Sequence, residues 1–387
     1  MRRSCIILII MFLSALFVGA QTLSAQSRKL SDSAYAAILT VGPGDEFYES
    51  FGHTALRICD TVRGIDLVFN YGSFYFDQDY FYLKFAKGKL DYFVLAQPFD
   101  EFIFEYQYYG RAVYEQRLLL DSTEMAALVA ALLNNVLPEN MFYAYDFFRD
   151  NCATRVRDMV EQSLRGRKLL KNEFPAEPNT YRTLIYKYTD STLLWWRLGV
   201  DLLLGLHCDE TLTAPQYMYV PMEMMTQYDT MRLANGQTLT ETPVQLLPER
   251  RKPLTKSVSP TLCFWLLFGA VALLTLAARR KGWRLYWMDG LLFGVASVLS
   301  LLLMYLWFVS DHYCCNWNLN LLWANPLLLW MVCRLRHPNY VVALIAAVLE
   351  LAFLVGYAWL PQQFNAAAIP MALMLVLRLS VRLVPKR

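Results

Sequence analysis

Polar and apolar residues alternate in short runs along residues 26–242, whereas long apolar runs fill the chain after residue 260. Helical spacing of apolar residues starts at Met125, where Asp121 and Glu124 form a capping box, and Pro138 ends this helix. Strands are predicted by the alternation at residues 35–41, 53–59, 65–71, 90–96 and 112–119. Strands mixed with helices in this way predict one α+β domain over residues 26–242.

The long apolar runs lie at residues 261–278, 287–309, 319–333, 341–360 and 366–383. Their length and low charge predict about five transmembrane helices, the third of them short and broken by Asn325–Pro326. We therefore expect an all-α transmembrane domain over residues 261–387. The prolines and basic residues of 243–260 predict a linker that continues neither helix nor strand.

Residues 1–25 have the pattern of a secretory signal peptide, with a basic start, an apolar core and small residues near Ala25. Translocation of the following domain puts the basic loops at 279–281 and 334–336 on the cytoplasmic side, as the positive-inside rule prefers. The sequence therefore predicts a multi-pass protein of the inner membrane, with residues 26–242 in the periplasm.

The composition agrees with a membrane protein. A net charge of +3 and 56% hydrophobic residues argue against a nucleic-acid partner. The basic residues of the linker 243–260 are the exception to the loop-charge rule. On the outer side they are either an ordinary solvated run or a contact for lipid phosphates.

The best candidate nucleophile is Cys152, which directly follows the helix-capping residues Asp150 and Asn151. Apolar residues recur at helical spacing from Val156 to Leu164, so the cysteine lies at or near the first helical position. The positive end of the helix dipole favours thiolate over thiol there. An aromatic run at 141–148 predicts a strand before the helix. The alternative is a buried structural cysteine.

His53 is the candidate general base for this cysteine. In the alternating run 53–58 it lies on the face opposite the more apolar one. The soluble part of the chain offers only His53 and His207 for the role. The alternative is a histidine with a purely structural role.

A third group is needed to orient the imidazole, and Asn70 is our candidate, followed by Asp60 and Glu46. Asn70 could equally be a turn residue ahead of Gly72. One helical turn after the cysteine, Arg155 is a candidate for binding a substrate phosphate or the thiolate. Its alternative role is a salt bridge to a surface carboxylate.

The sequence predicts neither a metal nor a cofactor. The four histidines are scattered, no Cys-x-x-Cys pair occurs and no phosphate-binding glycine loop is present. Cys59 and Cys208 could form a disulfide in an oxidising periplasm, and two free thiols fit the sequence equally well.

Six short segments between about residue 35 and residue 330 carry a combined signature. They are Ser50–Ile58, Phe69–Phe74, Lys84–Gly88, Tyr145–Arg155, Ser310–His312 and Asn318–Pro326. Together they resemble the Lnb family of bacterial lipoprotein N-acyltransferases. The resemblance implies a periplasmic thiol acyltransferase domain similar to permuted NlpC-type and lecithin-retinol acyltransferase-like folds. The histidine strand also precedes the cysteine helix, the reverse of the papain order, which suits a permuted version.

The resemblance further implies the reaction. The acceptor is the free amine of the diacylglyceryl-cysteine at a lipoprotein's N-terminus. We expect a membrane phospholipid to donate the acyl group through a Cys152 thioester, with His53 as the base.

His312 and Asn318 lie in a short outer loop between the second and third apolar runs, among tryptophans. Polar residues at this depth are costly unless they face protein, water or lipid headgroups. We expect them to line the entry of lipid and lipoprotein. Interfacial anchoring is the alternative for His312.

Two other functions remain open at this point. The same cysteine and histidine could hydrolyse cell-wall or secreted peptides as a membrane-anchored peptidase or amidase, or the domain could be an inactive periplasmic binding module. Five membrane spans exceed what a simple anchor needs, which favours a lipid substrate.

Overall fold

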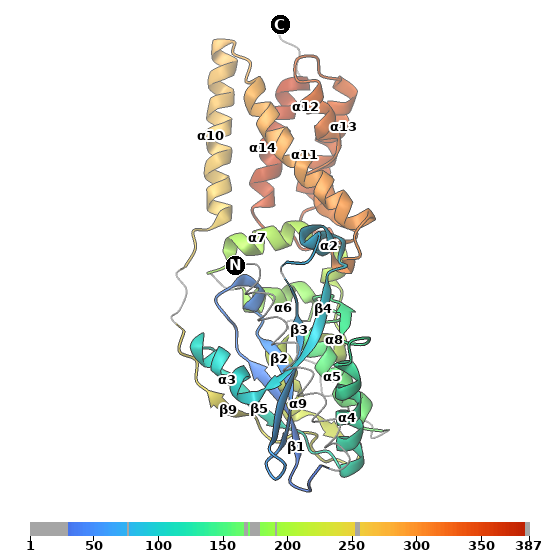
Figure 1. Cartoon of the computed structure of the whole chain (residues 1–387). Helices are drawn as coiled ribbons and strands as arrows, with labels where there is room; N and C mark the ends of the chain where they lie inside the picture. Colours follow the sequence, from blue (N-terminus) through green and yellow to red (C-terminus); the bar gives the residue numbers. More distant parts are fainter. Residues whose placement is uncertain are drawn as a thin grey trace, which may run out of the picture. The chain divides into compact units, whose positions relative to one another are not determined.

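The computed structural model describes residues 30–75, 77–165, 169–170, 179–189, 192–251 and 256–383. The predicted signal peptide, residues 1–25, lies outside this range. The chain forms two compact units, shown in Figure 1. The sheet unit comprises Met1–Asn179 and Leu212–Pro253, and the helical unit comprises Thr180–Thr211 and Leu254–Arg387.

The sheet unit is built on a seven-stranded antiparallel sheet with the order β6-β4-β3-β2-β1-β5-β9. The five predicted strands are confirmed, with ends that differ by at most two residues. The strands are β1 Tyr35–Val41, β2 His53–Asp60, β3 Ile65–Ser73, β4 Asp91–Pro98, β5 Val113–Arg117, β6 Phe142–Ala144 and β9 Val244–Leu247. A small second sheet pairs β7 Leu169–Leu170 with β8 Arg232–Leu233.

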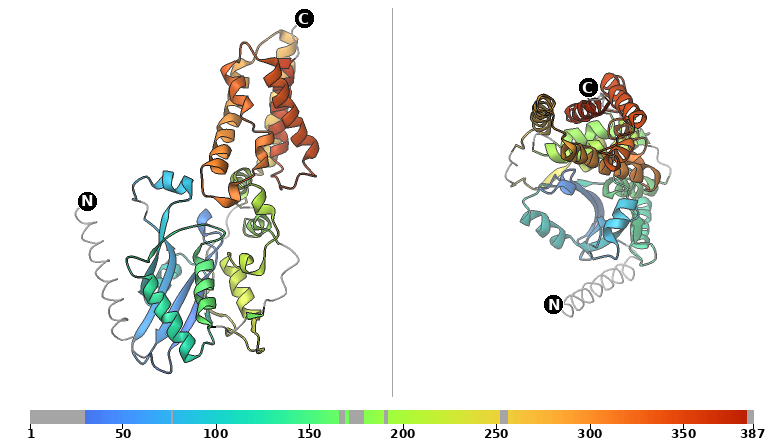
Figure 2. Two further views of the ribbon diagram at one scale, coloured as in Figure 1. Left: turned by 90° about the vertical axis from the view of Figure 1, so that its right-hand side faces the viewer. Right: turned by 90° about the horizontal axis from the view of Figure 1, so that it is seen from above.

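Helices cover both faces of this sheet, as Figure 2 (right) shows. On one face α4 (Ser122–Asn135) packs on α5 (Cys152–Ser163), which contacts β2 and β3. On the other face α3 (Phe99–Tyr108) contacts β3 and β4. Because both faces are covered, all residues of β2 except His53 are buried.

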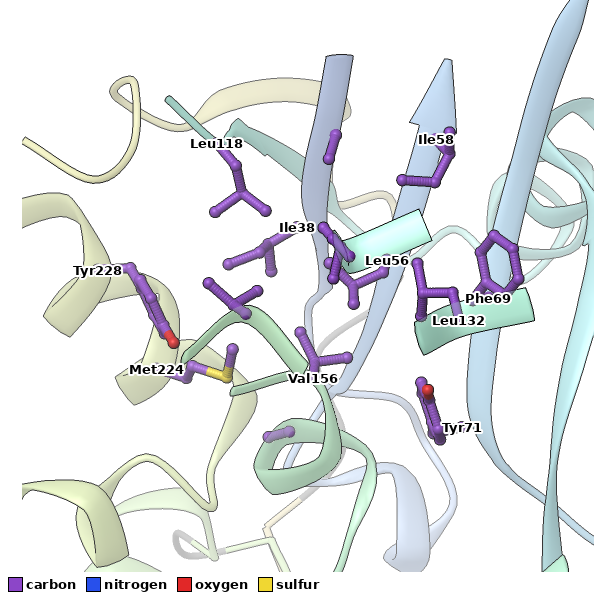
Figure 3. Close-up of a cluster of buried hydrophobic side chains, with 14 of the residues drawn as sticks. Ile38, Leu56, Ile58, Phe69, Tyr71, Leu118, Leu132, Val156, Met224 and Tyr228 are labelled. Atoms are coloured by element: carbon purple, nitrogen blue, oxygen red, sulfur yellow. The ribbon is translucent and has the colours of Figure 1, made fainter. Parts of the chain in front are cut away.

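The larger core lies on the α5 face. Leu56 of β2, Phe69 of β3 and Val156 of α5 meet there, as Figure 3 shows. The α3 face has its own smaller core, which includes Ala55 and Phe102. The alternation in β2 therefore separates two buried faces rather than a buried face from an exposed one.

The remaining helices of the sheet unit are short. They are α2 Phe81–Lys87, α8 Ala214–Tyr217 and α9 Pro221–Thr230, with a 3-10 turn η1 at Phe47–Glu49. The predicted capping box is confirmed at α4, where the Asp121 side chain accepts from the backbone N–H of Glu124 and the Glu124 side chain accepts from that of Asp121. These local signals start the helix where the sequence placed it.

The linker predicted for residues 243–260 is wrong at its start. There β9, Val244–Leu247, pairs with β5 at the edge of the sheet. Pro243 and Pro248 flank this strand and do not interrupt it. An edge strand also tolerates nearby proline, because one of its sides needs no hydrogen-bond partner.

The helical unit contains α6 Tyr181–Tyr188, α7 Leu194–Leu203, α10 Pro260–Lys281, α11 Tyr286–Phe308, α12 Leu327–Cys333, α13 Tyr340–Gly356 and α14 Ala368–Leu383. Short 3-10 segments lie at η2 Leu206–Asp209, η3 Tyr313–Cys315 and η4 Leu319–Leu322. Among the described residues, α10 and α11 are long and apolar enough to cross a membrane, and α13 is a shorter apolar helix.

The third predicted span is not one continuous helix. It divides into η4 and α12 around Asn325–Pro326, and α12 has seven residues. A helix of that length rises about 10 Å, whereas the hydrocarbon core of a bilayer is about 30 Å thick. The count of five crossing helices therefore stays a prediction.

The predicted domain boundary at residue 242 is too simple, because Thr180–Thr211 packs with the C-terminal helices. The buried amide of Asn318 donates to the backbone carbonyls of Leu202 and Leu203 at the end of α7 (2.8 and 3.0 Å). Gly205 lies so close to the Asn316 carbonyl that a Cβ atom there would be 1.9 Å from its oxygen. These contacts join a segment of the predicted periplasmic domain to the loop between α11 and α12.

Candidate active site

Cys152 occupies the first position of α5, as the sequence predicted, and Asn151 caps the helix. The Asn151 side-chain oxygen accepts from the Thr154 backbone N–H (2.9 Å), and the Thr154 hydroxyl oxygen accepts from the Asn151 N–H (2.8 Å). The Asn151 amide also donates to the carbonyls of Phe147 and Tyr219. A buried and fully bonded cap therefore fixes where the cysteine lies.

The segment before the helix is less extended than the predicted strand at 141–148. Only β6, Phe142–Ala144, is strand. The Asp146 carboxylate accepts from the backbone N–H groups of Phe148 and Arg149, and the chain turns there. Such a side-chain to backbone bond is typical of aspartate in turns. The cysteine thus follows a strand and a tight turn.

His53 and Asn70 lie together on neighbouring strands. His53 is the first residue of β2, and its Nε2 lies 2.6 Å from Oδ1 of Asn70 in β3. Because an amide oxygen only accepts, Nε2 carries the hydrogen and Nδ1 keeps the lone pair that a base needs. The turn alternative for Asn70 is wrong, since it pairs with Leu95 of β4 inside the sheet.

The two reserve candidates lie elsewhere. Asp60, at the other end of β2, accepts from the backbone and hydroxyl of Ser31. It lies seven residue steps along the strand from His53, or about 23 Å. Glu46 precedes η1, and its backbone carbonyl accepts from Ser50. Of these three candidates, Asn70 is the one whose side chain contacts the imidazole.

Cys152 lies at the same end of the sheet as this pair. Its sulfur faces the backbone N–H of Thr54, the residue after His53. A Cβ atom on Gly72, two residues after Asn70, would lie 3.8 Å from the Cys152 Cβ. The Tyr106 ring stacks on the His53 ring at 6.5 Å. Cysteine, histidine and asparagine therefore lie at the same end of the sheet, although no hydrogen bond joins thiol and imidazole among the described residues.

The thiol and the imidazole are both uncharged at neutral pH. Burial raises the pKa of Cys152 to about 11, although the backbone N–H groups of Thr54 and Ala153 lower it in part. Burial also lowers the pKa of His53 to about 4, with the Asn70 hydrogen bond acting in the opposite direction. The predicted preference for thiolate is therefore wrong for the resting site. A helix start stabilises an anion by only about 0.3–1 kcal/mol, which burial outweighs.

Arg111 is a site residue that the sequence did not predict. It is buried, and it donates to the Gly42 carbonyl (2.9 and 3.1 Å) and to the Glu49 carboxylate (3.0 Å). Its positive charge lowers the pKa of both His53 and Cys152. No local pattern identifies it, because it precedes β5 and reaches the site only through the pairing of β5, β1 and β2.

Arg155 takes the second of its two predicted roles. Its guanidinium forms two hydrogen bonds with the Asp150 carboxylate and lies 4.0 Å above the Tyr143 ring. This ion pair links Asp150, in the turn before α5, to Arg155, in the first turns of the helix. The contact of Arg155 with a substrate phosphate or the thiolate stays a prediction.

The two polar residues predicted near the lipid entry are in the helical unit. Asn318 is completely buried and bonded to α7, so its predicted role in substrate binding is replaced by a structural one. His312 precedes η3 and is partly exposed, with its backbone N–H donating to Ser310. Cys59 and Cys208 are free thiols in different units, and the Cys208 sulfur lies against the Cys314 carbonyl.

Fold and site together describe a chain with an α+β domain, in which a cysteine at a helix start and a histidine–asparagine pair lie at the same end of the sheet, and, among the described residues, two helices long and apolar enough to cross a membrane. Two family models match the chain: the Lnb N-terminal periplasmic domain over residues 24–187, and the Lnb transmembrane domain over residues 252–386. The chain belongs to the Lnb family. No curated protein and no solved structure matches it.

Membership of this family establishes the broad organisation. The chain has a periplasmic domain made of a sheet and helices, followed by a helical region with apolar helices. It is a membrane protein of a family associated with enzymatic lipoprotein modification. The permuted NlpC-like arrangement remains a prediction.

Proposed function

We propose that this protein N-acylates the N-terminal diacylglyceryl-cysteine of bacterial lipoproteins, using a membrane phospholipid as acyl donor. The observation that carries the proposal is Cys152 at the start of α5, next to the His53–Asn70 pair, in a chain of the Lnb family. This is the arrangement of a nucleophile, a base and an orienting group.

In the first half-reaction the Cys152 sulfur attacks the ester carbonyl of the phospholipid. Nδ1 of His53 takes the thiol proton, and Asn70 holds the ring by its Nε2–H. The C–O bond then breaks, and the lyso-lipid oxygen leaves with the proton from the imidazolium. The acyl group remains on sulfur as a thioester.

In the second half-reaction the amine of the diacylglyceryl-cysteine attacks this thioester. His53 takes a proton from the amine, the C–S bond breaks, and the thiol recovers its proton. The product is an amide, which is far more stable than a thioester, so the transfer runs forward.

Charge develops on oxygen and sulfur in both halves. Backbone N–H groups at the start of α5 are natural donors to the oxyanion, and the buried charge of Arg111 stabilises the thiolate. A site that starts with uncharged thiol and imidazole suits a lipid substrate, because no buried ion pair must be desolvated before the acyl ester binds.

A peptidase would use the same three residues, so the test must detect the acyl product. A reporter lipoprotein should gain the mass of one fatty acyl group when it is produced together with wild-type protein in cells that lack this activity. Cys152→Ala should abolish the gain, since it removes the nucleophile but keeps a helix-compatible residue. His207→Ala is the matched control, because His207 pairs with Glu210 in the helical unit.

Full acylation by well-expressed Cys152→Ala protein would overturn the thiol mechanism. A cleaved reporter without added mass would instead support the peptidase. An unchanged reporter in every strain would leave the binding module as the better description.

A further inference from the structure

A cavity of about 460 Å³ lies at the end of the helical unit where α10 finishes. Side chains of α10, α11, α14 and the loop before α13 line it. Five of these lining residues are arginines: Arg279, Arg284, Arg336, Arg378 and Arg382. Asp289 is the one acidic residue among the described residues that line it. The cavity is therefore strongly positive.

The inner part of the cavity holds more positive than negative charge. Nε of Arg378 donates to Oδ1 of Asp289 (2.6 Å), and Arg382 pairs with the other oxygen of the same carboxylate. Arg378 also donates to the Thr275 hydroxyl (2.9 Å), and Arg382 to the Leu335 carbonyl (3.0 Å). Arg378 and Asp289 are almost completely buried. Two arginines thus share one carboxylate, and uncompensated charge is costly in an apolar helix bundle.

The outer part of the cavity carries the other three arginines, which are exposed. Trp283 lies at the rim and is 58% exposed, with the Lys281 ammonium 4.7 Å from its ring. In the turns of α10 that precede these basic residues, the leucines at 273, 274 and 276 are exposed. Tryptophan and basic residues after an apolar helical stretch are typical of the headgroup region of a membrane.

We infer that this cavity binds the phosphate of an anionic phospholipid. The guanidinium groups supply paired N–H donors in the geometry that a phosphate accepts, and the added negative charge balances the buried cluster. The acyl chains of such a lipid would lie along the exposed leucines of α10. Basic pockets between membrane helices are known to suit anionic headgroups of this kind.

In the predicted topology this cavity lies on the cytoplasmic side, whereas the sheet unit that carries Cys152 lies in the periplasm, so we infer a lipid distinct from the acyl donor. Within the helical unit α7 contacts α10, and Leu194 of α7 lines the same cavity as Pro260 at the start of α10. The arginine cavity lies at the other end of this 22-residue helix, about 33 Å away. A phospholipid held there stabilises the bundle and does not serve as substrate.

The test uses the full-length protein, purified in a non-ionic detergent, freed of lipid and titrated with phosphatidylglycerol or phosphatidylethanolamine. Native mass spectrometry counts the bound lipid. The test variant is the double substitution Arg279→Gln with Arg336→Gln, both at exposed positions of the cavity. The matched control is Arg280→Gln with Arg334→Gln, which removes the same charge from the last turn of α10 and from the segment after α12, at residues that do not line the cavity.

We expect the wild type to bind phosphatidylglycerol more tightly than phosphatidylethanolamine. The test variant should lose roughly tenfold or more in affinity, while the control stays close to wild type. Equal losses in both variants would show a general surface charge effect and overturn the site. Displacement of the lipid by millimolar inorganic phosphate would show a free-anion site and overturn the assignment to lipid.

Discussion

Cys152 is subject to two opposing influences at the first turn of α5. Backbone N–H groups and the charge of Arg111 favour the thiolate, whereas burial favours the thiol and outweighs them. His53 is kept neutral by the same burial. The resting site is thus a thiol beside a neutral base, and the ionised pair forms only as the thiol attacks.

This state predicts how alkylation of Cys152 depends on pH. A thiol whose pKa is about 11 ionises only at high pH, so its alkylation by iodoacetamide should rise about tenfold per pH unit between about pH 6 and 10. Peptide mass spectrometry follows Cys152, with the exposed Cys333 as a reference for the reagent. A rate that is already constant between pH 5 and 8 would indicate a preformed thiolate–imidazolium pair.

Asn70 acts on the reaction through the imidazole. Asn70→Ala should lower the acyl-transfer rate by about 100-fold, because the ring loses the acceptor that selects its tautomer. Asn70→Asp keeps an acceptor but places a negative charge beside Nε2, which raises the pKa of His53. A base with a higher pKa becomes protonated at higher pH.

The acidic limb of the rate–pH profile should therefore move to higher pH in Asn70→Asp. A rate profile of Asn70→Asp that coincides with the wild type would contradict the proposed contact. A merely structural role of Asn70 would lower the rate without moving the limb.

At the scale of elements, local patterns account for most of the sheet unit. Alternation identified β1 to β5, and caps identified the starts of α4 and α5. These features depend on a few neighbouring residues. Three other features depend on segments far apart in the chain, and no local pattern encodes such pairings. They are the pairing of β9 with β5, the position of Arg111 near the active site, and the packing of α7 with the C-terminal helices.

Gly72 shows how one element shapes the site. It has a φ of +97° at the irregularity where β3 pairs with β4, and it lies next to Cys152. Gly72→Ala should cost about 1–2 kcal/mol from backbone strain and also lower activity, because relief of the strain shifts the strand beside the cysteine.

Gly64→Ala is the matched control for this substitution. Gly64 has a φ of +66°, and a Cβ atom there would meet nothing within 4 Å. Thermal unfolding and acyl-transfer rate of both variants separate the two effects. Equal activities in Gly64→Ala and Gly72→Ala would show that Gly72 matters only for stability.

At the scale of the whole molecule, the helical unit includes a segment from the predicted periplasmic domain. Thr180–Thr211 packs with the C-terminal helices, and Asn318 and Gln362 bond its backbone carbonyls. Away from this segment, the basic residues of 279–284 and 334–338 lie together around the arginine cavity. The predicted topology, with the α11–α12 loop outside and both basic segments inside, stays a prediction.

Labelling of single cysteines tests the topology. In a background without the partly or fully exposed Cys263, Cys315 and Cys333, Trp317→Cys should react with an impermeant maleimide in intact spheroplasts. Arg336→Cys should react only after the membrane is permeabilised. Protection at 317 together with labelling at 336 would reverse the assignment.

The central claim is that Cys152 carries an acyl group between two lipid substrates. Purified wild-type enzyme incubated with phospholipid alone should gain the mass of one fatty acyl group on the Cys152 peptide and release lyso-lipid, because no amine is present to discharge the thioester. His53→Ala should accumulate little of this adduct. A diacylglyceryl-cysteine peptide should then remove the acyl group and become N-acylated. Absence of the adduct, with cleavage of a peptide substrate by the same enzyme, would contradict the account.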